Sequence, residues 1–312
     1  MKIWYLQINR VCNHNCIFCS NPENGKMLDI NQVRKKLKNL KKNNYKEVIL
    51  TWGEPTLHPD LFKIIKICDK FWIKPRLITN WSKLANSNFV EKISNSSTTL
   101  VNLSVYTHKR NLNNKLRRKN KAFKKMIKAL KNLNKYNVPT QITTVISRQN
   151  QDHLYETLLF IKKISPNINH FVWNVLDPLM MEQNQKTLNS IPNLNKLEKT
   201  INKCLNYLSN INNTFRIERI PLCLIPWYER ANTECRKLVK KENRKVFFLD
   251  SRQAHEQKAN WFRHDYKKKC KECNLYDICS GVYKMEEYYQ NVKLTPQKST
   301  KQKEAIKTKI LN

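Results

Sequence analysis

Short apolar runs and longer amphipathic runs alternate along the first half of the chain. The apolar runs predict strands at residues 3–8, 47–51, 76–79, 100–106, 141–146 and 170–176. Helical periodicity predicts helices at 30–42, 61–71, 88–93, 121–136 and 154–164. Strict alternation predicts an α/β fold with a parallel sheet, either open and doubly wound or a partial TIM-like barrel. Both arrangements place ligands at the carboxyl ends of the strands.

The alternation stops near residue 177, and this change predicts the domain organisation. A helix is expected at 194–208 and a strand at 215–220, after which the chain is irregular, aromatic and rich in cysteine. We therefore predict a barrel domain over 1–210 and a small cysteine-bearing domain over 211–291. Residues 292–312 form a basic polar tail, which we expect to be disordered or weakly helical.

Composition limits the classes of protein that remain. Hydrophobic residues make up 40% of the 312 residues, enough for a core, while the net charge is +35. Such a charge suits an anionic partner, a tRNA or an acidic peptide, although solvated helix faces explain it equally. The sequence shows neither a signal peptide nor a run approaching about 18 apolar residues, so we expect a cytoplasmic protein without a membrane partner. In that reducing compartment the ten cysteines are expected to be metal ligands or reactive thiols.

Three cysteines follow the first predicted strand at the spacing C-x3-C-x2-C, namely Cys12, Cys16 and Cys19. Three thiolates hold three irons of a [4Fe–4S] cluster and leave the fourth iron open for another ligand. A zinc knuckle that uses His14 is the alternative. His14 lies between the first two cysteines, where it could hardly close the same tetrahedron, so the spacing favours the cluster.

With Phe18 as the aromatic residue before the third cysteine, this motif resembles that of the radical S-adenosylmethionine (SAM) superfamily. The second strand is followed by Trp52–Pro55, similar to the family's Gly-Gly-Glu-Pro segment with tryptophan in place of the first glycine. Asn80 follows the third strand and Ser104 ends the fourth, as in the family. The resemblance covers about residues 1–180, with the motifs in the family's order.

The resemblance implies a partial (βα)6 barrel of the TIM-like type and a [4Fe–4S] cluster whose open iron chelates SAM. One electron from the cluster then cleaves SAM to methionine and a 5′-deoxyadenosyl radical, which abstracts hydrogen from a substrate. A reducing partner such as flavodoxin or ferredoxin would supply that electron.

The residues expected to contact SAM lie at strand ends. A Gly-Glu-Pro turn lets the backbone approach a ligand, and the Glu54 carboxylate can accept the ammonium group of SAM. Asn80 and Ser104 are either contacts or turn formers. The family also places an arginine after the fourth strand, where Arg117 and Arg118 both occur. The predicted SAM-binding residues are Phe18, Trp52, Gly53, Glu54, Asn80, Ser104 and, beside the adenine, Val175.

A second group of cysteines, Cys270, Cys273 and Cys279, has the spacing C-x2-C-x5-C. It resembles the shortened SPASM/twitch domain that binds an auxiliary cluster in many radical SAM enzymes. The resemblance implies one auxiliary [4Fe–4S] cluster, with zinc as the alternative. Cys223 is the expected fourth ligand and Cys235 its competitor. If Cys235 is not a ligand, it is a candidate hydrogen donor near the radical.

We therefore predict a radical SAM enzyme that abstracts hydrogen from a peptide, a protein or a similar substrate. Two alternatives remain. The first keeps the chemistry but takes a tRNA or another nucleic acid as substrate. The second is a non-enzymatic iron–sulfur or zinc protein that binds nucleic acid.

Overall fold

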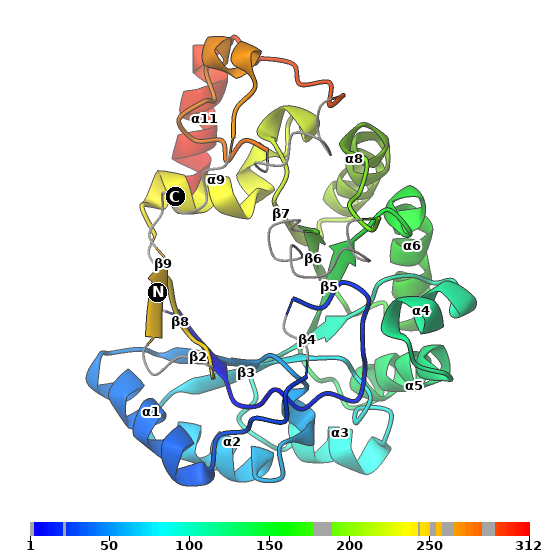
Figure 1. Cartoon of the computed structure of the whole chain (residues 1–312), viewed down its shortest axis with the longest axis vertical. Helices are drawn as coiled ribbons and strands as arrows, with labels where there is room; N and C mark the ends of the chain where they lie inside the picture. Colours follow the sequence, from blue (N-terminus) through cyan, green and yellow to red (C-terminus); the bar gives the residue numbers. More distant parts are fainter. Residues whose placement is uncertain are drawn as a thin grey trace. The chain divides into compact units, whose positions relative to one another are not determined.

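The computed structural model describes residues 3–20, 23–176, 189–242, 244–249, 254–257, 265–282 and 291–312. The chain divides into two compact units, whose elements are coloured along the sequence in Figure 1. The first unit comprises Met1–Thr143, Phe160–Asn169 and Arg244–Gln257. The second comprises Thr144–Leu159, His170–Asn243 and Lys258–Asn312. The predicted boundary after residue 210 therefore falls inside the second unit.

Parallel strands in sequence order form the sheet of the first unit. Strands β1 to β4 each pair in parallel with the next strand in the chain, up to β5. In this register Trp4 lies opposite Val48, and Leu103 lies opposite Ile142. On the other side of β1 lies β8, also parallel, and β9 is antiparallel to β8. The bounds are Ile3–Gln7, Glu47–Thr51, Lys74–Thr79, Leu100–Ser104 and Thr140–Ile146 for β1–β5, Arg244–Phe247 for β8 and Ala254–Gln257 for β9.

Helices connect these strands and cover one face of the sheet, as Figure 1 shows for α1, α2, α3 and α5. Each buries an apolar stripe at helical spacing; α1, for example, buries Val33, Leu37 and Leu40. The Asp29 side chain accepts hydrogen bonds from the first turn of α1 and, with Gln32, completes a capping box. The bounds are Ile30–Lys42 (α1), Leu61–Lys70 (α2), Ser87–Ser94 (α3), Arg110–Arg117 (α4) and Ala122–Lys135 (α5).

The second unit contains β6 (His170–Val175) and β7 (Thr214–Glu218), which pair in parallel. Among its described helices are α8 (Leu194–Asn210), α9 (Thr233–Lys240) and α11 (Thr300–Leu311). Helix α6 (Leu154–Ile164) and strand β5 run from one unit into the other. Among the described helices, none is long and apolar enough to cross a membrane.

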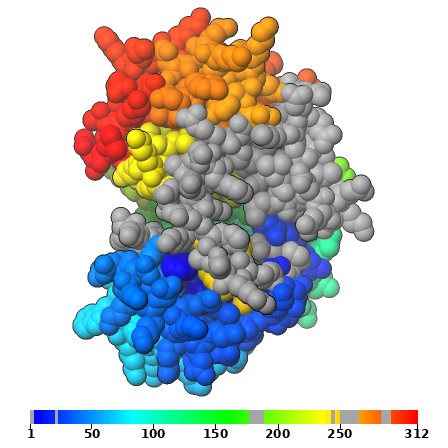
Figure 2. Space-filling model, turned by 60° about the vertical axis from the view of Figure 1, so that its left-hand side comes forward, coloured from blue at the N-terminus to red at the C-terminus, as the bar shows by residue number. Residues whose placement is uncertain are grey.

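The tail, which we expected to be disordered or weakly helical, forms the twelve-residue helix α11 over Thr300–Leu311. Ile306 and Ile310 lie four residues apart on one face of α11, and both are buried in an apolar cluster of this unit. The tail is polar in composition, but this pair suffices to dock a helix whose other faces are solvated. Figure 2 shows the red helix α11 packed beside the orange segment that precedes it.

Candidate functional site

The three cysteines of the first motif lie in the loop that joins β1 to α1. Cys12 and Cys16 are half-buried and Cys19 is exposed. Burial raises the pKa of the Cys12 thiol to about 11 and also raises the pKa of Cys16. Cys16 adds to the shift of Cys12, and Cys19 adds to that of Cys16, so the three sulfurs act on one another. A metal centre bound here would displace their protons.

This loop is held by α4, a helix that sequence periodicity did not predict. The backbone N–H groups of Asn15 and Ile17 donate to the carbonyls of Arg117 and Leu116, at 3.3 and 3.0 Å. The buried ring of Phe18 packs edge-on against the ring of Tyr106, with the two centroids 4.8 Å apart. Phe18 therefore anchors the loop by packing, and the carboxyl end of α4 fixes its backbone.

The Arg117 side chain is fully buried directly beneath the cysteine loop. Its guanidinium group lies between the rings of Trp81 and Tyr106, at 4.5 and 4.2 Å from their centroids. One terminal nitrogen donates to the Ser104 carbonyl at 2.6 Å, and the other lies 3.2 Å from Nδ1 of His14. A buried cation stacked on two aromatic rings is held in one orientation.

Arg117 brings positive charge to the sulfur of Cys16. Its side chain hydrogen-bonds Cys16 and lowers the pKa of that thiol, against the larger raising effect of burial. Burial, with Arg117 as the next cause, lowers the pKa of His14 to about 3, so this imidazole is neutral. The Nε of Arg117 is buried without a hydrogen-bond partner among the described residues. Arg117 is thus suited to stabilise an anionic thiolate or ligand in this loop.

Glu54, at the end of β2, is fully buried and ties two strand ends together. Its Oε1 accepts from Thr56 N at 3.1 Å, Thr56 Oγ1 at 2.5 Å and Thr79 Oγ1 at 2.6 Å. Its Oε2 accepts from Asn80 N at 2.5 Å. Burial raises the pKa of Glu54, and these hydrogen bonds lower it. The carboxylate that the sequence assigned to SAM is therefore engaged within the chain.

Asn80 connects this network to the cysteine loop. Its Nδ2 lies 3.6 Å from the sulfur of Cys12 and donates to Asn13 Oδ1 at 2.9 Å. Its Oδ1 accepts from the Ser82 hydroxyl at 2.6 Å. The structure thus brings together Glu54, Asn80 and Cys12, which the sequence had placed at the ends of different strands.

Gly53 lies where the turn after β2 contacts the cysteine loop. Its φ is +54°, and an added Cβ would lie 2.5 Å from Asn9 Oδ1 and 2.7 Å from the Val11 carbonyl. The next amide, that of Glu54, donates to this same carbonyl at 2.8 Å. Only glycine fits this approach. Asn9 Oδ1 is buried and has no hydrogen-bond partner among the described residues.

The other predicted contacts occupy strand ends as expected. The Trp52 ring packs against Phe248, with centroids 5.2 Å apart, and against Tyr5 at 6.2 Å. Ser104 ends β4 and is half-buried. Val175 is buried at the end of β6, in the second unit. Their roles as SAM contacts stay predictions.

A second group of cysteines lines a pocket within the second unit. Cys223, Cys270, Cys273 and Cys279 all line this pocket. Burial raises the pKa of Cys223 to about 12, and the other three thiols add to that shift. The segment after β7 therefore brings Cys223 to the three cysteines of the C-terminal motif.

Backbone amides donate to the sulfurs around this pocket. The Gln297 amide lies 3.3 Å from the Cys273 sulfur, and the Gly281 amide lies 3.4 Å from that of Cys279. The backbone of Thr295 hydrogen-bonds Cys223, and this bond lowers the pKa of Cys223 against the larger raising effect of burial. Hydrogen bonds of this kind stabilise thiolates and tune the potentials of iron–sulfur clusters.

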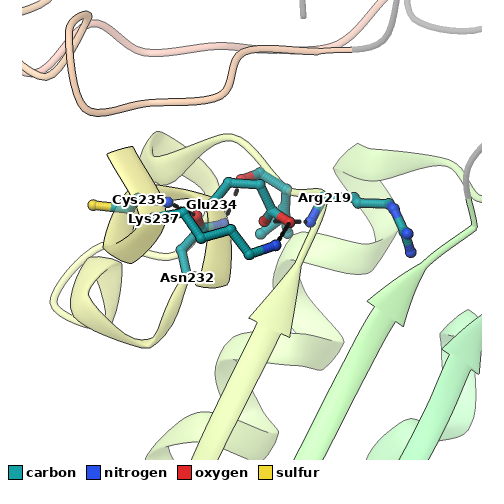
Figure 3. A network of polar contacts seen from close by, with 6 residues as sticks. Arg219, Asn232, Glu234, Cys235 and Lys237 are labelled. Carbon is teal, nitrogen blue, oxygen red and sulfur yellow. Dashed lines mark hydrogen bonds and ion pairs between the residues drawn. The ribbon is translucent and has the colours of Figure 1, made fainter. Parts of the chain in front are cut away.

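Cys235 lies on α9, in an apolar cluster against which Cys273 and Cys279 also pack. It is fully buried in this cluster, and burial raises its pKa to about 12. Figure 3 shows its side chain directed away from Arg219. It does not line the pocket, although Cys279 contributes to its pKa. The cluster consists of Leu222, Cys235, Leu275, Ile278, Ile306 and Ile310.

A buried ion pair, which the sequence analysis missed, fixes α9 against the end of β7. Glu234 Oε2 accepts from the Arg219 amide at 2.9 Å, and Lys237 Nζ lies 3.9 Å from Glu234 Oε1 (Figure 3). Asn232 caps the helix by accepting from the Cys235 amide at 2.7 Å. The network holds the segment that carries Cys223, and no spacing in the sequence marks it.

Both cysteine groups fit iron–sulfur clusters. Each offers thiols from a short loop, with amide or guanidinium donors at the sulfurs. Among the described residues, no three His, Cys, Asp or Glu side chains stand close enough to hold a single metal ion. A cluster binds each thiolate to a different iron and accepts wider spacing.

Comparisons with known proteins agree with this geometry. The model of the Radical SAM superfamily matches residues 6–161. A protein of Methanocaldococcus jannaschii is 26% identical over 235 residues, 72% of this chain and 79% of its own length. The PqqA peptide cyclase of Bradyrhizobium diazoefficiens is 26% identical over 153 residues, 48% of this chain and 40% of that protein.

Solved structures share the fold. SuiB of Streptococcus suis, bound to S-adenosylmethionine, aligns with a TM-score of 0.65 and 20% identity over 90% of this chain and 72% of its own. The structure of anSMEcpe with bound AdoMet aligns with a TM-score of 0.67 and 16% identity over 99% of this chain and 96% of its own. At these identities the likeness shows the fold, and it confirms the predicted partial TIM-like barrel class.

A three-cysteine loop after the first strand of a parallel α/β sheet defines a class of iron–sulfur enzymes with one open iron. This chain belongs to the radical SAM superfamily, since the family model spans the loop, the Gly53–Glu54 turn and the strand ends beside them. The predicted resemblance is confirmed, and so is the prediction that the protein is an enzyme that uses SAM and a [4Fe–4S] cluster.

Proposed function

We propose that this protein abstracts hydrogen from a peptide or protein substrate and carries one auxiliary [4Fe–4S] cluster. The observation that carries the proposal is the pocket of the second unit, where Cys223 joins the three cysteines of the C-terminal motif. The overall likeness to anSMEcpe, which extends over 99% of this chain, supports a second unit of the same kind.

In this proposal Cys12, Cys16 and Cys19 hold the SAM-binding cluster. When bound, the cluster and SAM supply a carbon-centred radical that abstracts hydrogen. The chain itself orients these groups: Arg117 sets the charge beside Cys16, and Asn80 donates toward Cys12. Gly53 keeps the backbone open at the strand edge.

The auxiliary cluster would be held by Cys223, Cys270, Cys273 and Cys279. All four line one pocket, and backbone amides donate to the sulfurs. Cys235 lies in the apolar cluster instead, which supports Cys223 as the fourth ligand. The role of Cys235 as a hydrogen donor stays a prediction.

A peptide substrate is supported by the structural neighbours. SuiB has been solved with its precursor peptide SuiA, and anSMEcpe with the Cp18Cys peptide. The +35 charge suits an acidic peptide. The reducing partner, the cytoplasmic location and the tRNA alternative stay predictions.

Iron content tests the auxiliary cluster. After anaerobic reconstitution we expect about eight irons per chain, two clusters of four. Replacing Cys270, Cys273 and Cys279 together with alanine should leave about half of the iron. Cys223→Ala should also leave about half, because a cluster that lacks one ligand is lost. Cys235→Ala should keep the full content. Equal losses in Cys223→Ala and Cys235→Ala would remove the ligand assignment, and zinc in place of iron would remove the cluster.

The substrate class is tested by SAM cleavage. The reconstituted enzyme, with dithionite, is given a clarified extract of the cells that make the protein, and 5′-deoxyadenosine is measured. The proposal expects stimulation that protease treatment of the extract abolishes and ribonuclease treatment leaves intact. The opposite pattern would favour the tRNA alternative.

A further inference from the structure

Four tryptophans have a left-handed backbone. The φ angles of Trp52, Trp72, Trp81 and Trp227 are 61°, 58°, 68° and 74°. A bulky L-residue is a genuine outlier in this region, because its Cβ crowds the neighbouring carbonyl. Glycine has no Cβ and enters the region freely. All three glycines of the chain have positive φ as well.

The enrichment belongs to tryptophan. Six of the seven tryptophans are described, position 261 being the exception, and four of these six are left-handed. Lysine and arginine number 59 in the chain, and among those that the structure describes four are left-handed: Arg118, Lys121, Arg219 and Lys241. The remaining left-handed residues are asparagines, which tolerate the conformation.

Trp72 lies two residues after the end of α2, in a motif that favours glycine. Its N–H donates to the Asp69 carbonyl at 2.9 Å, and the Ile73 N–H donates to the Cys68 carbonyl at 3.0 Å. This hydrogen-bond pair is the Schellman motif, in which glycine, or else asparagine, holds the left-handed position. Helices α1, α5 and α8 end in the same pair of bonds with asparagine there, and α4 and α9 with a basic residue: Asn44, Asn137, Asn212, Arg118 and Lys241.

Trp227 occupies a second kind of glycine position. The Tyr228 N–H donates to the Ile225 carbonyl at 3.0 Å, which closes a turn with Pro226 and Trp227 at its centre. Proline followed by a left-handed residue is the type II turn, whose third position calls for glycine. The indole gains nothing here: Trp227 is 84% exposed, and Trp72 is 82% exposed.

The other two positions lie at strand ends in the site. Trp52 and Gly53 are successive left-handed residues after β2, and Trp81 follows Thr79–Asn80 after β3. Trp81 is buried, and its ring contacts both His14 and Arg117. Glycine at position 52 would let the turn approach a ligand over two residues, and glycine at 81 would open space beside Arg117.

We infer that positions 52, 72, 81 and 227 are glycine positions, and that the protein carries glycine there in the cell that makes it. Average proteins contain about 7% glycine, roughly 22 residues in a chain of this length, whereas three stand here. Glycine at the four positions would raise the number of glycines from three to seven. A single codon can place tryptophan where glycine belongs, because UGA is read as tryptophan in some genetic codes and as glycine in others. Trp4 and Trp173, buried in β1 and β6 with ordinary φ, are true tryptophans encoded by UGG.

Thermal unfolding of single-site variants tests whether the backbone at these positions prefers glycine to tryptophan. Trp72→Gly and Trp227→Gly should each raise Tm by about 1–3 °C, and Trp72→Asn should match Trp72→Gly. Trp72→Ala, which removes the ring but keeps Cβ, should stay below Trp72→Gly. Trp173→Gly is the matched control and should lower Tm by roughly 10 °C or more. A drop of that size in Trp72→Gly and Trp227→Gly would overturn the inference.

The codons of the gene and the masses of peptides from the native protein test whether these positions are translated as glycine. We expect UGA at codons 52, 72, 81 and 227, and UGG at codons 4 and 173. Peptide mass spectrometry of the protein isolated from its own cells should show the mass of glycine at the four positions. UGG at any of them, or the mass of tryptophan in the native peptides, would refute the inference whatever the enzyme's substrate.

Discussion

Replacing Glu54 with glutamine separates a structural role from a direct contact with SAM. Three donors reach its Oε1 and the Asn80 amide reaches Oε2, all within a fully buried site. Glutamine keeps one oxygen, so its NH₂ group must face at least the Asn80 N–H, donor against donor. A lost hydrogen bond to a charged group costs about 1.5–3 kcal/mol, and a buried unsatisfied donor about 1–3 kcal/mol. Relief of the buried charge offsets part of this loss, so we expect about 2–4 kcal/mol of destabilisation.

Urea unfolding of the cofactor-free protein measures this loss, as a lower midpoint at unchanged slope. Glu91→Gln on the exposed face of α3 is the control and should stay within about 0.5 kcal/mol of the parent. SAM binding by the reconstituted protein is measured beside it. If Glu54→Gln unfolds like the parent while SAM affinity falls, Glu54 contacts SAM directly and our account of its role is refuted.

Two further predictions follow from the buried contacts. Arg117→Gln removes the cation beside Cys16, so the midpoint potential of the SAM cluster should fall by on the order of 50 mV in redox titrations, equivalent to about 1 kcal/mol. Arg118→Gln, at an exposed residue, is the control. An unchanged potential in Arg117→Gln would contradict the charge argument. Ile310→Ala should lower the free energy of unfolding by about 2–5 kcal/mol, because Ile310 is buried in the apolar cluster around Cys235; a change no larger than that of Lys309→Ala would show that α11 does not stabilise the second unit.

The local elements could be predicted where the apolar pattern was strong. Segments 30–42, 47–51 and 154–164 were predicted with the bounds that the structure has. Helix α4 was missed because its residues are almost all polar, with Leu112 and Leu116 as the only large apolar side chains in it. Strands β8 and β9 are too short to show a period of two.

The motifs of the site were also visible in the sequence, since thiols at fixed spacing and a Gly-Glu-Pro turn have few other uses. Their connections were not. The bonds from Asn80 to Asn13 and from Arg117 to the cysteine loop join residues more than sixty positions apart. Cys223 and Cys235 were competitors in sequence, and only packing separated them, one onto the pocket and the other into the apolar cluster.

The sequence by itself determined the family, the parallel α/β class and the two groups of thiols, because spacing and periodicity are properties of the chain. The tertiary structure decided how the charges are used: Glu54 accepts hydrogen bonds within the chain, and Arg117 is buried beneath the cysteine loop. It also showed which tryptophans occupy glycine positions, since a φ angle is set by the turn that neighbouring elements close. Burial and backbone angle depend on distant neighbours, which no local pattern contains.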